Sequence, residues 1–295
     1  MKKFNSKAAV FICALTFLSQ VSMAGDLEPS AAPGPTMKTL DQVEPRTPIT
    51  SVPCTISASG SYYLTKNLNS TGTAITVTAD NVTIDLCGFT LTGPSSGVSY
   101  GIYMNGRSNV EIRNGTICNF YGGIQEGSAI NGIGHRVIGV RVIANSRYGI
   151  QLYGNGHEVR NCISRNNGAG ATVDPVYGIY VDSGCTVTGN TVYNNGNLAT
   201  VSVTGIFAGQ GSTASANNVS KNGASSSDWV WGILAGAGCA VIGNTVNSNG
   251  IGASGTVSGI GLDGNNLVDQ NIAYNNTGTN MNHPANCTYG TNHAP

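Results

Sequence analysis

A Gly-Ile pair recurs at near-regular intervals along most of the chain, and this recurrence restricts the possible folds more than any other feature. The spacings between successive pairs are 22, 26, 29, 27, 27 and 27 residues. A period of 20–50 residues is typical of a repeat architecture, in which each repeat buries its apolar face against its neighbours. The pairs begin at Gly101, Gly123, Gly149, Gly178, Gly205, Gly232 and Gly259.

The content of each repeat favours β-structure. Short apolar alternations lie between Gly and Asn turns, as in Val187–Gly196 and Val241–Gly250, and no stretch has the periodicity of an amphipathic helix. The chain has 41 Gly, and only 9% of its residues are charged. Its 14 basic and 14 acidic residues provide no basic surface, so we expect no nucleic-acid partner.

The repeat length selects among the β-architectures. Propeller blades need about 40 residues, and leucine-rich repeats need regular Leu and a helix. We therefore predict an all-β fold, a right-handed parallel β-helix with about seven coils of 22–29 residues. The Ile residues of the pairs should form one interior column. A second column should contain Met104, Leu152, Val181, Ala208, Ala235 and Leu262.

Glu126 interrupts the second column, which predicts either an irregular coil or a shifted register at this point. Asn residues recur at the turns and predict two amide ladders, because an Asn amide can bond its copy one coil away. One ladder would contain Asn145, Asn167, Asn195, Asn222, Asn249 and Asn276, and the other Asn161, Asn190, Asn217, Asn244 and Asn271.

The ends of the chain have different compositions. Residues 1–24 are predicted to be a secretory signal peptide, with basic residues, an apolar stretch and a small-x-small cleavage site ending at Ala24. Residues 25–36 are predicted to be a linker, 37–60 an N-terminal cap with a short helix over 37–46, 61–276 the β-helix, and 277–295 a C-terminal cap or tail. We expect a secreted or periplasmic protein with no membrane insertion after signal cleavage.

Seven cysteines follow the predicted signal peptide, and an oxidising compartment would permit disulfides. Cys54 and Cys87 flank the cap and first coil and are expected to be bridged. Cys185 and Cys239 occupy equivalent positions two coils apart, about 9.6 Å at one strand spacing per coil. This exceeds the roughly 7 Å limit for a disulfide, so no bond is expected between them.

Three segments near the start of the repeats resemble a known protein family. The runs Met37–Arg46, Gly60–Thr65 and Val82–Leu91 resemble the leading part of exported bacterial β-helix proteins of the pectin-lyase-like superfamily. The resemblance implies the fold over roughly 37–276. The superfamily includes polysaccharide lyases and hydrolases, tailspikes, adhesins and periplasmic copper-processing proteins, so the resemblance does not select an activity.

Outward positions beside the Gly-Ile strand predict a sugar-binding face, because aromatic rings pack on pyranoses and amides bond hydroxyls. A plain aromatic cover over a flat sheet is the structural alternative. Neighbouring outward positions carry Tyr100, Tyr148, Tyr177, Trp231, Gln125, Leu234, Asn105 and Asp263. The predicted substrate-binding residues on this face are Tyr103, Gln151, Tyr153, Tyr180, Asp182 and Phe207.

Variable loops precede the later Gly-Ile pairs, and such loops on a rigid stack often carry sites. Asp174 and Asp228 lie at the same loop position two coils apart, about 9.6 Å. This is near the upper end of the carboxylate separation in inverting glycosidases, roughly 6.5–9.5 Å. They are the candidate catalytic pair, with ordinary turn chemistry as the alternative.

A basic cluster could bind an acidic sugar, or be a solvated turn region. Arg147 and His157 are its predicted substrate-binding members, beside His135, Arg141, Arg160 and Arg165. The tail residues Met281, His283, Cys287 and His293 suit Cu or Zn by type, but their spacing matches no closed zinc motif. No metal and no cofactor is therefore expected.

These patterns predict an exported protein that binds or processes a polysaccharide or surface glycan. The low charge of the coils argues against a strongly anionic substrate. An enzyme of this kind would be a polysaccharide lyase or a glycoside hydrolase. The alternatives are a non-catalytic structural or adhesive surface protein and a periplasmic metal-handling protein.

Overall fold

The computed structural model describes residues 44–127 and 132–295. The predicted signal peptide, the linker and nearly all of the predicted helix over 37–46 lie outside these ranges. Residues Pro45–Pro295 form one compact unit, and all elements assigned to the described residues are β-strands.

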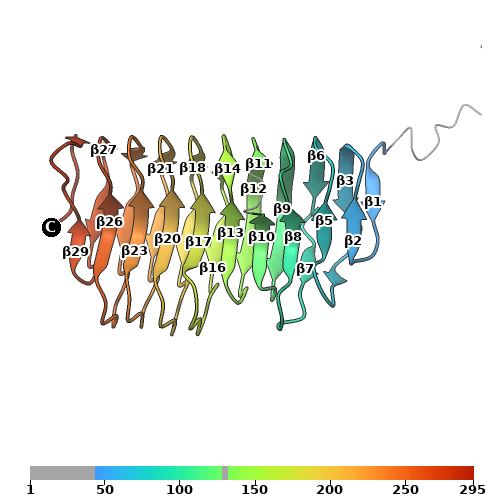
Figure 1. Ribbon diagram of the computed structural model, residues 1–295, viewed down its shortest axis with the longest axis horizontal. Coiled ribbons are helices and arrows are strands. Elements are labelled where there is room, and N and C mark those ends of the chain that lie inside the picture. Colours follow the sequence, from blue (N-terminus) through green and yellow to red (C-terminus); the bar gives the residue numbers. More distant parts are fainter. Residues whose placement is uncertain (1–43, 128–131) are drawn as a thin grey trace, which may run out of the picture. The chain divides into compact units, whose positions relative to one another are not determined.

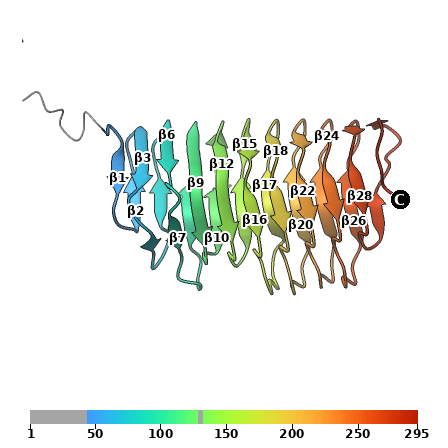
Figure 2. The same cartoon turned by 180° about the vertical axis from the view of Figure 1, so that it is seen from behind.

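The strands stack as a parallel solenoid, seen from opposite sides in Figures 1 and 2. A ten-stranded sheet, here called sheet I, forms one face. It contains β2 (Cys54–Ile56), β5 (Ile75–Val77), β8 (Tyr100–Met104), β10 (Gly122–Glu126), β13 (Tyr148–Leu152), β17 (Val176–Val181), β20 (Val203–Ala208), β23 (Val230–Ala235), β26 (Val257–Leu262) and β29 (Thr279–Met281).

An 18-stranded sheet, sheet II, covers the remaining two faces, because its long strands β9 and β12 each pair with two strands of a neighbouring coil. It contains β1 (Thr47–Ile49), β3 (Gly60–Leu64), β4 (Leu68–Asn69), β6 (Val82–Asp85), β7 (Thr90–Thr92), β9 (Val110–Cys118), β12 (Arg136–Ile143), β15 (Glu158–Arg160), β16 (Ile163–Arg165), β18 (Thr186–Thr188), β19 (Thr191–Tyr193), β21 (Thr213–Ser215), β22 (Asn218–Ser220), β24 (Ala240–Ile242), β25 (Thr245–Asn247), β27 (Leu267–Asp269), β28 (Ile272–Tyr274) and β30 (Thr288–Tyr289). The short strands β11 (Gly132–Ile133) and β14 (Gly154–Asn155) form a third sheet.

The strand register confirms the predicted parallel β-helix. The Ile residues of the Gly-Ile pairs are paired from Ile102 to Ile260 and are fully buried. The stack is longer than the seven coils marked by these pairs, because β2 and β5 precede them and β29 follows. The sequence signal was shorter because these three strands lack the Gly-Ile pair.

The register does not shift at Glu126. Glu126 pairs with Met104 of the preceding coil and is 0% exposed, so a carboxyl group occupies a position that holds an apolar side chain in neighbouring coils. The apolar interior consists of Ile, Val, Leu, Ala and Met with Phe120 and three Cys, and these residues form one continuous cluster.

The first predicted Asn ladder is confirmed over its full length. Each buried Asn from Asn145 to Asn249 donates its side-chain amide N–H to the Oδ1 of the Asn in the next coil, at 2.9–3.0 Å. The same Oδ1 also accepts the backbone N–H of that donor Asn. Asn276 continues the ladder to Asn280. This ladder therefore satisfies both the side chains and the turn backbone inside the stack.

The second ladder is confirmed from Asn190 to Asn271, but the prediction for Asn161 is wrong. The backbone N–H of Cys162 donates to Asn190 Oδ1, so Cys162 holds the position one coil earlier. Asn161 instead has φ of 54° and occupies the preceding turn position, which Asn tolerates. At its far end, Asn271 donates to Asn292.

The first ladder explains the Gly of the Gly-Ile pair. A Cβ on Gly178 would lie 2.9 Å from Asn195 Nδ2 and 2.6 Å from both Val192 Cγ1 and Gly205 O. These contacts are too close for a side chain. Gly is therefore required because the ladder amide and the next strand approach the backbone at this point.

A third ladder runs through a turn where the residue types are mixed. In most of these coils a side-chain acceptor takes a backbone N–H from the coil before, as in His157 N–H to Cys185 Sγ at 3.3 Å and Cys185 N–H to Ser212 Oγ at 3.0 Å. The acceptors are His135, His157, Cys185, Ser212, Asn266 and Cys287. Cys239, whose own N–H donates to Asn266, lies in the same turn.

All seven cysteines in the described part of the chain are free thiols. The expected Cys54–Cys87 bond is not formed, because Cys54 lies in β2 of sheet I and Cys87 follows β6 of sheet II. Burial raises the pKa of the Cys162 and Cys185 thiols to about 11.

The stack includes strands from the sequence before and after the predicted solenoid range of 61–276. Strand β1, within the predicted cap, pairs with β3, and β29 and β30, within the predicted tail, pair with β26 and β27.

Substitution of Asn195 by Ala should destabilise the fold strongly. The change removes the acceptor of two Asn167 N–H groups and the donor to Ser164 O and Asn222 Oδ1, all buried. At about 1–3 kcal/mol for each polar group left unpaired, we expect a loss of at least about 3 kcal/mol. Thermal and urea denaturation measure this loss.

The neighbouring residue provides the control. Asn194 has φ of 54° and makes one side-chain amide bond, to Asn166. Because Gly adopts this conformation freely, Asn194→Gly should cost less than about 1 kcal/mol. Equal losses for the two variants would contradict the ladder as the main polar support of the turn.

Candidate functional site

The outward surface of sheet I carries a continuous series of aromatic rings. The predicted outward column is confirmed as a structural register, since Tyr103, Gln125, Gln151, Tyr180, Phe207 and Leu234 are paired coil by coil. We define the aromatic face as the rings of Tyr100, Tyr103, Tyr121, Tyr148, Tyr153, Tyr177, Tyr180 and Phe207.

Ring contacts connect this face across five coils. Beginning in β8, the centroid distances are 5.2 Å for Tyr103–Tyr100, 6.1 Å for Tyr100–Tyr121, 5.8 Å for Tyr121–Tyr148, 6.3 Å for Tyr148–Tyr177, 5.0 Å for Tyr177–Tyr180 and 4.8 Å for Tyr180–Phe207. Tyr153 adjoins Tyr180 at 5.1 Å. Such contacts stabilise the rings against one another and hold them half-exposed in fixed orientations.

Amide and carboxyl groups lie among the rings. Gln151 donates to the Tyr153 hydroxyl at 3.0 Å, and Asp182 Oδ2 accepts the Gly154 N–H at 3.3 Å. Burial is the main cause that raises the pKa values of Tyr100, Tyr121, Tyr153, Tyr177 and Tyr180. These phenols therefore stay uncharged at neutral pH and can donate a hydrogen bond.

Tyr121 was not predicted as part of this face. In its coil Gly122 takes the outward place that Tyr100 and Tyr148 hold in the flanking coils, and Tyr121 stands one residue earlier. Its ring nevertheless fills the gap between Tyr100 and Tyr148. The sequence did carry a signal for this ring, because Gly122 stands where the flanking coils have Tyr and Tyr121 comes directly before it.

A cavity lies at the β5–β8 end of the aromatic face. It has a volume of about 290 Å³ and is lined by Thr76, Val77, Thr78, Tyr103, Asn105 and Arg107. Asn105 Oδ1 is buried and accepts no hydrogen bond. The sequence did not indicate this cavity, because β5 precedes the first Gly-Ile pair.

The variable loops stack on one another as regularly as the strands do. Backbone bonds join Gly170 to Asn197 and Ala171 to Thr200, and Ala171, Val176, Ala199 and Val203 form a small apolar cluster of their own. The predicted catalytic candidates Asp174 and Asp228 both lie in these loops. Each is engaged by a protein group, Asp174 by Arg147 and Asp228 by the Ser202 hydroxyl at 2.7 Å.

Arg147 is 3% exposed and lies where the row of long loops begins. Its Nη2 is 3.1 Å from Asp174 Oδ2, and its guanidinium carbon is 5.5 Å from the centroid of the Tyr148 ring. The ion pair is not aligned as a hydrogen bond, and Nε and Nη2 have no hydrogen-bond partner. The predicted cluster is thus divided, with Arg147 beside the aromatic face and Arg160 and Arg165 on sheet II.

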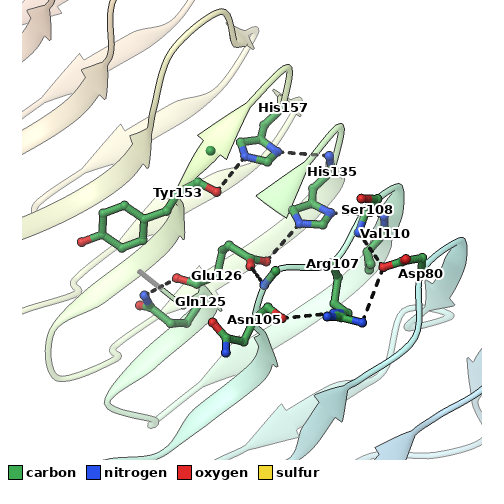
Figure 3. A network of polar contacts seen from close by, with 12 residues as sticks. Asp80, Asn105, Arg107, Ser108, Val110, Gln125, Glu126, His135, Tyr153 and His157 are labelled. Atoms are coloured by element: carbon green, nitrogen blue, oxygen red, sulfur yellow. Dashed lines mark hydrogen bonds and ion pairs between the residues drawn. The ribbon is translucent and has the colours of Figure 1, made fainter. Parts of the chain in front are cut away.

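His157, the other predicted basic ligand, is 1% exposed and belongs to a polar network inside the stack (Figure 3). Its ring stacks on that of His135 at 4.9 Å, and His135 Nε2 is 3.0 Å from Glu126 Oε2. Glu126 Oε1 accepts the Gly106 N–H at 2.5 Å. Its burial places His157 away from the aromatic rings that solvent can reach.

The backbone fixes the tautomers of both histidines. His135 Nδ1 accepts the Val110 N–H and His157 Nδ1 accepts the His135 N–H, so the ring proton of each neutral imidazole is on Nε2. These Nε2–H groups donate to Glu126 and to Tyr153 O. Burial, with the neighbouring His135, lowers the pKa of His157 to about 4.

The predicted soft ligands of the tail do not converge. Met281 is buried at the end of the core, the His283 ring packs against Tyr289 at 5.1 Å, and Cys287 belongs to the third ladder. Across residues 44–127 and 132–295, no three His, Cys, Asp or Glu side chains are placed to hold a metal ion.

Comparison with solved structures places the fold among parallel β-helices. The A-module of the Azotobacter vinelandii mannuronan C-5 epimerase AlgE4 matches with a TM-score of 0.53 and 12% identity, over 84% of this chain and 86% of the module. The AlgE6 A-module from the same organism gives 0.47 and 13%, over 83% and 79%. The Dettilon tailspike protein gives 0.43 and 15%, over 84% and 60%.

The architecture is that of the right-handed parallel β-helix, as the family resemblance implied. A scan against protein-family models finds no match. A search of curated proteins finds none either. Within the described ranges, no helix has the length and apolar character needed to span a bilayer.

The buried His157 should make stability depend on pH. Its pKa is about 4 in the folded protein and near 6.5 when unfolded, so the unfolded chain binds more protons between these values. Stability contributed by the neutral ring is therefore complete above about pH 6.5 and falls by roughly 3 kcal/mol on acidification to pH 4. Urea denaturation across this pH range measures the loss.

His157→Asn removes the titrating group and keeps a side-chain acceptor in the ladder, as Asn266 does in its own coil. This variant should lose most of the pH dependence between 4 and 6.5. The exposed His283 provides the control, since His283→Asn should keep the parent's profile. An unchanged profile in His157→Asn would show that other groups cause the acid sensitivity.

Proposed function

We propose that this protein binds a polysaccharide chain along the aromatic face of sheet I. The observation that carries the proposal is the continuous contact of eight rings over five coils, with amide, hydroxyl and carboxyl groups between them. A linear sugar chain presents apolar ring faces and hydroxyls in repeated succession, and this surface offers complementary groups in the same succession.

The rigidity of the face supports this proposal. Binding loses less conformational entropy when the contacting side chains are already ordered, and Tyr rings have only two rotatable side-chain bonds. The rings are ordered by their mutual contacts and by the strand register beneath them. A series of isolated exposed rings would lack this preorganisation.

The fold is also compatible with such a role. The structural neighbour AlgE4 is a mannuronan C-5 epimerase, so a parallel β-helix of similar extent acts on a polysaccharide in that protein. The proposal for this chain rests on its own surface, because a neighbour at 12% identity supports the fold and not the ligand.

The proposal concerns binding and assigns no catalytic step. Asp174 and Asp228 were the sequence candidates for catalysis, but each is paired with a protein group in its loop. The proposal is therefore limited to glycan binding by the aromatic face. We also propose, from the predicted signal peptide, that the protein is exported.

Replacing Tyr180 by Ala should weaken glycan binding by about three- to tenfold, the contribution typical of an aromatic stacking contact. The ring contacts Tyr153, Tyr177 and Phe207, so we also expect a modest loss of stability, about 1–2 kcal/mol. A glycan array followed by calorimetric titration of the best oligosaccharide, below the melting range of both proteins, measures the affinity.

Tyr193→Ala is the matched control. Tyr193 is an outward tyrosine of β19 in sheet II, covered by the Lys221 ammonium at 5.6 Å from its centroid. Its removal should leave glycan affinity unchanged. Parent-like binding by Tyr180→Ala for every glycan that the parent binds would show that the rings only cover the sheet.

A further inference from the structure

Sheet I has an unusual charge distribution for a surface this large. Its ten strands contain no Lys or Arg, and their one carboxyl side chain, Glu126, is fully buried. Any charge that a ligand on the aromatic face would meet must therefore come from the edges of the sheet.

Two guanidinium groups lie at these edges, and both have carboxylate partners. Arg107 lies 3.8 Å from Asp80 and donates to the carbonyls of Asn105 and Thr78. Arg147 lies 3.1 Å from Asp174. Asp182 adds a carboxylate beside Tyr153, so the edges supply no excess of positive charge.

By its offset from the paired isoleucines, Arg147 corresponds in sequence to a residue that is a buried valine in the later coils. Arg147 stands three residues before Ile150, and Val176 stands three residues before Ile179, the strand partner of Ile150. The valine column then continues coil by coil from Val176 through Val203 and Val230 to Val257. Arg147 is 3% exposed, so its cation needs a counterion, because an unpaired buried charge is strongly destabilising.

The partner of Arg147 comes from the exposed loop above it. The Asp174 side chain is 66% exposed, against 3% for Arg147. The Nε and Nη2 edge of the guanidinium, the edge that binds carboxylates in a two-bond fork, makes no hydrogen bond. Asp174 thus lies beside this edge of the guanidinium without completing the fork.

From this arrangement we infer that the aromatic face selects uncharged sugar chains and that Asp174 sets the selectivity by neutralising Arg147. The inference rests on the proposed function and specifies its ligand class. A uronate chain on this face would have to displace Asp174 or leave its own carboxylates unpaired, and the second carries a desolvation cost. A neutral chain meets rings, hydroxyls and amides and needs no counterion.

Matched pairs of oligosaccharides test this inference on the full chain. Cello-oligosaccharides are compared with glucuronan oligomers, mannan with mannuronan oligomers, and methyl-esterified with free oligogalacturonates, all at low ionic strength. The parent should bind the neutral member of any pair that it recognises at least about tenfold more tightly.

Asp174→Asn should then gain uronate binding by about tenfold or more, the range of a hydrogen bond to a charged group. The gain should become smaller in 1 M salt, where the Debye length falls to about 3 Å, although the burial of Arg147 limits the screening. Arg147→Val combined with Asp174→Asn continues the valine column and should not gain uronate binding. Asp228→Asn, two loops further on and hydrogen-bonded to Ser202, is the control that should also show no gain.

The outcomes separate the two claims. Tighter binding of the uronate member by the parent overturns the inference and leaves glycan binding intact. A folded Asp174→Asn without the gain, or a gain that survives Arg147→Val, overturns the role of Asp174. Absence of binding to every glycan overturns the proposed function itself. If Asp174→Asn does not fold, the parent's preference within the matched pairs still decides the ligand class.

Discussion

The buried amide of the Asn ladder is the interaction on which the arrangement of this molecule depends. Each rung accepts a backbone N–H and an amide N–H from one coil and donates to the next, so a displaced coil would leave several buried polar groups unpaired. Apolar columns alone tolerate sliding, because one valine packs much like another. The amides fix which residue of a coil stands over which residue of its neighbour.

That fixed register produces the surface. Outward residues of successive coils stand in straight columns because the inward residues do, and the rings of Tyr180 and Phe207 meet in nearly parallel planes, 9° apart. The Gly of the Gly-Ile pair connects the two sides, since its missing Cβ gives space to the ladder amide. The loop residues vary without disturbing this order, because they carry their own hydrogen bonds and small apolar cluster.

Much of this could be predicted from the sequence, because a repeated structure repeats its local rules. The Ile column, the Asn145–Asn276 ladder and the outward column all follow from a 27-residue period. Prediction was less successful where one coil departs from its neighbours. Cys162 replaces Asn at a ladder position, Glu126 is buried with His135, and Tyr121 stands one residue off its column.

The charged residues show why the site was harder to predict than the fold. Arg147, His157 and Arg165 are close in sequence, but one lies by the aromatic face, one inside the stack and one on sheet II. Sequence proximity across a coil carries no information about which face a side chain joins. The partner of Arg147 comes from 27 residues later, in the loop before β17.

The uniform coils toward the C-terminal end have a consequence for how such a chain can change length. The Gly-Ile pairs from Gly178 to Gly259 are each 27 residues apart, and Asn190, Asn217 and Asn244 are hydrogen-bonded in the same way in each coil. Duplication or deletion of one such 27-residue unit would rejoin every ladder and column in phase. Such a change would lengthen or shorten the surface of sheet I in whole steps of about 4.8 Å and would keep the hydrogen-bonding pattern of the stack.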